Sequence, residues 1–78
     1  MVIPFRRVLD AKTQEIILDE GFARDLAEVA YTMQQDGHHV VAEGMRNLSR
    51  HHRIRGLKAR AEIMILASEN ERYLGDED

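Results

Sequence analysis

The chain lacks cysteine and tryptophan and has a single proline among its 78 residues. The absence of cysteine excludes a disulfide scaffold, a thiolate zinc site and a cysteine nucleophile. Its longest apolar run, Ile63 to Ala67, is far shorter than the roughly 20 residues that a membrane-spanning helix needs. Asp10 and Lys12 stand where the apolar stretch of an export signal should follow Arg6 and Arg7. We therefore expect a cytoplasmic protein that does not enter a membrane.

The chain is short but too apolar for a disordered protein, since 44% of its residues are hydrophobic. A chain of this length buries only about 60% of its extended surface, and no disulfide compensates for this. We expect one small domain over residues 1–78 without a deep catalytic cleft.

The first part of the chain predicts an extended arm followed by a helix. Pro4 disfavours a helical conformation for the residue before it, so residues 1–9 are interpreted as an arm. Asp10 or Thr13 could cap a short turn, and Asp19 is the expected cap of a helix over 19–36. A short strand over residues 16–18 is the alternative, because β-branched residues are poor in an exposed helix.

Gly37 ends this helix, because glycine adopts the left-handed conformation that commonly follows a helix end. A second helical pattern then runs from about residue 39 to residue 73. Gly56 is the position at which this long helix could kink or break. Residues 75–78 are expected to form a disordered acidic tail. The apolar stripe of the two helices, expected to form the core or a dimer interface, comprises Phe22, Leu26, Val29, Met33, Val41, Met45, Leu48, His52, Ala59, Ile63, Leu66 and Tyr73.

A tight turn at Gly37 predicts an all-α antiparallel helical hairpin. Counting outward from the turn places Val29 beside Met45, Leu26 beside Leu48, and Phe22 near His52. The second helix would then overhang the first over residues 57–74, leaving apolar side chains for the arm or a second copy of the chain to cover. Because two helices form too few layers for a stable core, we expect a homodimer that resembles a four-helix bundle.

Charge is distributed unevenly along the chain. No acidic residue interrupts the segment between Glu43 and Glu62, whereas residues 10–36 carry seven acidic and two basic residues, a net charge of −5. The basic segment has two interpretations: it pairs with the acidic helix, for example Arg50 with Asp25, or it binds an anion or partner. The first is favoured. The candidate binding residues are Arg46, Arg50, Arg53, Arg55, Lys58 and Arg60.

No catalytic or metal site is predicted. The four histidines form two adjacent pairs, and neighbours on a helix point about 100° apart, which makes each pair a poor chelate. Ser49 and His52 share a helix face, but no acid is expected to orient the histidine.

The sequence favours a non-catalytic protein–protein interaction module that acts as a homodimer without a cofactor, with an unknown protein partner. The alternative is a nucleic-acid or phosphate-binding protein that uses the basic residues of 46–60. It is not favoured, because the segment has no aromatic residue on which bases could stack and the net charge is −3.

Overall fold

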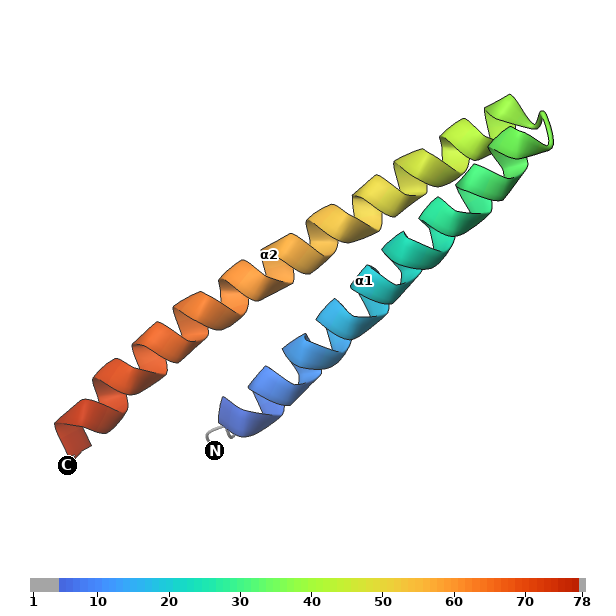
Figure 1. The fold of residues 1–78 in the computed structure, drawn as a ribbon. Helices are drawn as coiled ribbons and strands as arrows, with labels where there is room; N and C mark the ends of the chain where they lie inside the picture. The colour runs from blue at the N-terminus through green and yellow to red at the C-terminus, as the bar shows by residue number, and fades with distance from the viewer. Residues whose placement is uncertain (1–4, 78) are drawn as a thin grey trace.

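The computed structural model describes residues 5–77, and the side-chain surroundings of residues 6–69, as two antiparallel helices. Helix α1 spans Phe5–Gln35 and helix α2 spans His39–Glu77. They lie side by side as a rod of 62 × 17 × 16 Å, with the two chain ends at the same end of the rod (Figure 1). The predicted all-α hairpin is confirmed. No helix within the described residues is long and apolar enough to cross a membrane.

The turn forms at the predicted glycine. Gly37 has a φ of +87°, in the left-handed region that favours glycine. Its N–H donates to the carbonyl of Gln34, and the His38 N–H donates to the carbonyl of Met33. This pair of bonds is the Schellman arrangement, which satisfies carbonyl groups that the helix end would otherwise leave unpaired. Helix α2 starts at once, and its Ala42 N–H donates to the carbonyl of His38.

The expected arm over residues 1–9 is wrong for residues 5–9, which form the first turns of α1. Residues 1–4 lie outside the described part of the chain. Pro4 stands immediately before the helix, a place that tolerates proline because the first N–H groups of a helix have no partner within it. Val8 and Leu9 are half-buried and Ile16 is buried, so packing against α2 stabilises the helix here and outweighs the weak helix preference of the β-branched Val8 and Ile16.

The expected caps and the alternative strand are also wrong. Asp10, Thr13 and Asp19 all lie inside α1, and residues 16–18 are helical. The Thr13 hydroxyl donates to the carbonyl of Leu9 within the helix. Asp19 is buried between the helices, where its carboxylate is satisfied by partners on α2.

Helix α2 is continuous through Gly56, as the preferred interpretation expected, and runs beyond the predicted end at residue 73. Residues 75–77 of the expected disordered tail are helical, and Asp78 lies outside the described residues. Gly56 is buried against α1, where an added Cβ would meet the Cγ of Glu20 at 3.4 Å. It therefore permits close approach of the helices and does not bend one of them.

The helices meet through small residues at a seven-residue spacing. This is the spacing that keeps one seam of each helix facing its partner over several turns. No large side chain among the described residues is fully buried. The buried positions of the seam are Ile16, Ala23 and Ala30 on α1 and Ala42, Ser49 and Gly56 on α2, with Asp19 and Ala59 beside them.

The predicted apolar stripe lies beside this seam and only partly within it. Its register is confirmed at one point, because the rings of Phe22 and His52 lie 5.3 Å apart. Ala59 is buried, and the Tyr73 side chain lies outside the described part of the structure. The half-buried members are Leu26, Met33, Met45, His52, Ile63 and Leu66, and the exposed ones are Phe22, Val29, Val41 and Leu48.

The expected overhang over residues 57–74 is wrong in extent. Because α1 begins at Phe5, it runs alongside most of this segment. Ala59 is buried, Ile63 and Leu66 are half-buried, and Lys12 of α1 pairs with Glu62 of α2. The first helix covers the seam that the prediction left for an arm or a second copy.

Replacing Gly56 by leucine tests the close approach. A Cβ at this position would already be in van der Waals contact with Glu20 and Asp19, so the further atoms of leucine would have to displace them. We expect the free energy of unfolding to fall by about 1–3 kcal/mol. Gly21→Leu is the control, because a Cβ there meets nothing within 4 Å and the loss of a helical glycine stabilises by about 0.5–1 kcal/mol. Urea unfolding followed by circular dichroism measures both variants. Equal effects would contradict close packing at Gly56.

Candidate interaction surfaces

The seven-residue repeat divides the hairpin into two long sides. On each helix, the residue one position before a buried seam residue lies on one side of the antiparallel pair. The residue four positions after a buried seam residue lies on the opposite side. Phe22, with its ring against His52, marks the first side. Arg60, which donates to Glu20, marks the second. We call them the apolar side and the arginine side.

The apolar side carries large hydrophobic residues that no part of the hairpin covers. Phe22 and Val29 precede Ala23 and Ala30 on α1, and Val41 and Leu48 precede Ala42 and Ser49 on α2. Their exposed fractions range from 39% for Val29 to 52% for Leu48. Four half-buried neighbours lie between them and the seam: Leu26, Met33, Met45 and His52. Together these eight residues form a continuous apolar surface over the half of the hairpin nearest the turn.

A cluster of charges ends the apolar side toward the chain termini. The Asp19 carboxylate accepts a hydrogen bond from His52 Nδ1 at 2.9 Å and lies 3.7 Å from Arg55 Nε. Farther along, Lys12 pairs with Glu62 and Glu15. The hydrogen bond to Glu62 raises the pKa of Lys12 above its ordinary value, and the Glu15 charge adds to this shift. These pairs fix the register of the helices and mark the limit of the apolar surface.

Asp19 also corrects the expectation that no acid orients His52. The structure places an aspartate, a histidine and Ser49 close together, which is the residue set of a hydrolase triad. The Ser49 hydroxyl, however, donates to the carbonyl of Ala23 at 2.6 Å and is buried. A nucleophile must instead be exposed and hydrogen-bonded to its histidine. The three residues therefore tie the helices together.

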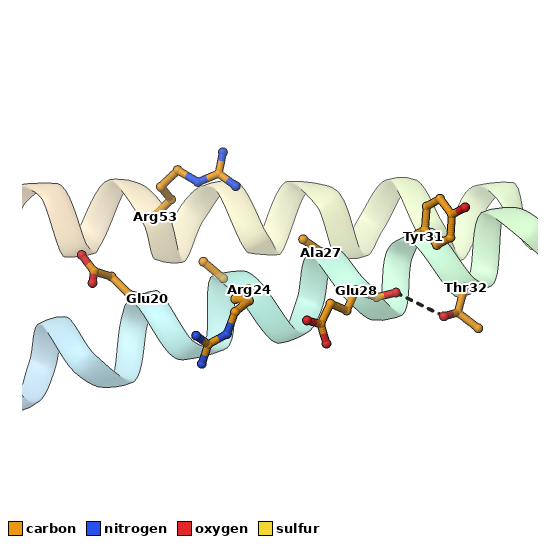
Figure 2. Close-up of a pocket in the computed structure, with 8 residues that line it drawn as sticks. Glu20, Arg24, Ala27, Glu28, Tyr31, Thr32 and Arg53 are labelled. Atoms are coloured by element: carbon orange, nitrogen blue, oxygen red, sulfur yellow. Dashed lines mark hydrogen bonds between the residues drawn. The ribbon is translucent and has the colours of Figure 1, made fainter.

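The arginine side carries an open groove along the hairpin. The floor consists of Ala23, Ala27 and Ala30 on α1 together with Ser49 on α2. Two adjoining depressions of about 800 and 350 Å³ share Ala27, Tyr31 and Arg53. Figure 2 shows Ala27 between the two helices, Arg53 extending from α2 away from α1, and Arg24 and Glu28 extending from the outer edge of α1.

The six basic residues predicted as a binding site do not share one surface. Arg46, Arg50 and Arg53 line the groove, and Arg60 continues the same side. Arg55 and Lys58 lie on the opposite side of the hairpin, in a small depression with Glu15, Asp19 and Glu62. The six candidate binding residues therefore fall into two groups on opposite sides of the hairpin.

Some of the six basic residues form polar contacts with α1. Arg60 binds Glu20 through two hydrogen bonds of 2.7 and 2.9 Å, and Arg55 approaches Asp19. Arg46 donates to the side-chain oxygen of Gln34. Among the described residues, Arg50 and Arg53 form no ion pair, and the expected pair of Arg50 with Asp25 is absent. Positive charge that α1 does not neutralise is thus concentrated on the groove.

The other histidines lie at or near the surface. His39 contacts the side-chain amide of Gln34 next to the turn, and the ring of His51 lies 5.8 Å from that of His52. Within the part of the chain that the structure describes, no group of three or more histidine, aspartate or glutamate residues is placed to hold a metal ion.

No protein-family model, curated protein or solved structure matches this chain.

Truncating Asp19 tests the buried ionic contact. Asp19→Ala removes the partner of His52 and Arg55, and we expect the free energy of unfolding to fall by about 1–3 kcal/mol. Asp25→Ala is the control, because Asp25 is exposed one and a half turns farther along α1 and should change stability by less than about 0.5 kcal/mol. Thermal or urea unfolding measures both, and an equal loss in the two variants would refute a stabilising role for the Asp19 contact.

Proposed function

We propose that this protein is a non-catalytic helical interaction module that acts as a homodimer, with the apolar sides of two hairpins packed face to face. The observation that carries the proposal is the gathering of Phe22, Val29, Val41 and Leu48 on one uncovered side. Soluble monomers rarely leave an apolar surface of this extent exposed.

The small size of the internal core supports the same proposal. Its buried apolar residues in the described part of the chain are Ile16 and four alanines. Complete burial of one large apolar side chain contributes about 1.5–3 kcal/mol, whereas alanine contributes much less. A second hairpin on the apolar side would bury Phe22, Val29, Val41 and Leu48, four of the twelve large hydrophobic residues that are exposed among the described residues. The product is a four-helix bundle with two-fold symmetry.

The alternative, a nucleic-acid or phosphate-binding protein, has weaker support. Arg46, Arg50 and Arg53 supply positive charge, but Arg55 and Lys58 face the other side. Glu28 lines the same groove as Arg53 and would repel a phosphate backbone, and Glu20 beside it already pairs with Arg60. The overall charge of −3 also opposes attraction to nucleic acid.

Two adjacent valines provide a matched test of dimerisation. Val40 is 86% exposed and belongs to neither side, whereas Val41 is 47% exposed and belongs to the apolar side. Glutamate at either position introduces the same charge into the first turn of α2, so its effect on helix stability is the same. We expect Val41→Glu to produce a monomer and Val40→Glu to remain dimeric.

Light-scattering chromatography measures the mass, with circular dichroism to show that both variants stay helical. The wild-type chain and Val40→Glu should elute at about twice the chain mass of 9.0 kDa, and Val41→Glu at that mass. A wild-type monomer at all concentrations, or dimers of both variants, would contradict the proposal.

A further inference from the structure

The groove on the arginine side has the length and floor of a site for a helix. Its lining runs from Glu20 to Gln34, which corresponds to roughly 21 Å along α1. Ala23, Ala27 and Ala30 form its floor, and these small residues allow an added helix to lie close against the surface of the helix pair. Tyr31, 68% exposed, lines both depressions and offers an aromatic contact toward the turn end of the groove.

The arginines along the groove indicate that a helix bound there would place acidic residues along the edge that faces α2. Arg46, Arg53 and Arg60 recur every seven residues on α2, with Arg50 beside them. A helix that lies along the hairpin repeats its own side chains at the same interval of about 10.5 Å. Arg60 already pairs with Glu20. Acidic residues repeated at that interval would therefore meet Arg46 and Arg53. Arg50 and Arg53 form no ion pair among the described residues.

The residues of α1 that line the groove favour a protein helix over a nucleic acid as its partner. Glu20, Arg24 and Glu28 alternate in charge along it. A phosphate backbone is negative along its whole length and would be repelled by Glu28, whereas the charge of Glu20 is already paired with Arg60. A protein helix can carry acidic residues along one edge and basic or neutral residues along the other.

We propose that the groove on the arginine side binds an amphipathic helix of a partner protein, with an acidic edge against Arg46, Arg50 and Arg53 and small apolar residues against the alanine floor. This inference deepens the proposed function, because it names the class of partner for an interaction module. It uses the side opposite to the proposed dimer interface, so both surfaces can be occupied at once.

The test uses a fluorescent helical peptide of three heptads, with alanine and leucine on its apolar stripe and glutamate on one edge. A second peptide has glutamine in place of each glutamate. We expect the full chain to bind the glutamate peptide at least tenfold more tightly at low salt, and this difference to shrink as salt rises. Fluorescence anisotropy gives both affinities.

Two chain variants with equal net charge locate the binding site. Arg46→Gln combined with Arg50→Gln and Arg53→Gln removes three charges from the groove, and should weaken peptide binding at least tenfold. Arg6→Gln combined with Arg7→Gln and Lys58→Gln removes three charges elsewhere, and should leave the affinity within about twofold. Circular dichroism confirms that both variants are folded.

Three results would overturn the inference. The first is no preference for the glutamate peptide. The second is arginine-dependent binding of labelled single-stranded or duplex DNA that exceeds peptide binding, which would make the groove a nucleic-acid surface. The third is loss of the wild-type dimer in the groove variant alone, which would assign the groove to a second copy of this chain. Failure of the proposed dimer shows separately, as a monomeric mass of the wild-type chain with peptide binding intact.

Discussion

The close contact of two helices through small residues is the constraint on which the rest of this structure depends. Alanine, serine and glycine at seven-residue intervals bring α1 and α2 together along a narrow seam. The seam excludes water, but it buries little apolar area. Specific polar contacts therefore help to hold the pair in register: the Ser49 hydroxyl on the Ala23 carbonyl, and His52 and Arg55 on Asp19.

The narrow seam also explains why the hairpin has two different sides. Phe22, Val29, Val41 and Leu48 lie at the edge of the seam on one side. Other large apolar residues, such as Val40 and Tyr31, are exposed elsewhere on the hairpin. The other side receives the long arginine side chains of α2, which need space and solvent. The apolar side and the arginine side therefore both arise because the seam has room mainly for small residues. In our proposals, a second copy of the chain occupies one side and a partner helix occupies the charged groove on the other side.

The sequence predicted the topology because the turn signal was local and strong. Gly37 ended one helical pattern and a second began at once, and counting from it placed Phe22 correctly against His52. The start of α1 could not be predicted in the same way. Pro4 disfavours a helix only for the residue before it, and the helix begins at the residue after it. The burial of Val8, Leu9 and Ile16 in the helix pair is not visible in the local sequence.

The sequence did not predict the small residues as the contact between the helices, because the large apolar residues give the stronger periodic signal. Ala23 and Ala30, or Ser49 and Gly56, carry little hydrophobic signal individually, although their seven-residue spacing is visible in the sequence. The partner of His52 was missed for a related reason. Asp19 at the start of a helical pattern resembles a cap, and its burial depends on the longer α1. The division of the six basic residues between two sides likewise required the register of both helices.

The most direct test of the account is an isotope-filtered nuclear Overhauser measurement on an equimolar mixture of labelled and unlabelled chain, which detects only contacts between different copies. The account predicts such contacts among Phe22, Val29, Val41 and Leu48, and none to Ala27 or Tyr31 in the groove. Contacts between copies confined to the groove, or no contacts between copies at all, would contradict it.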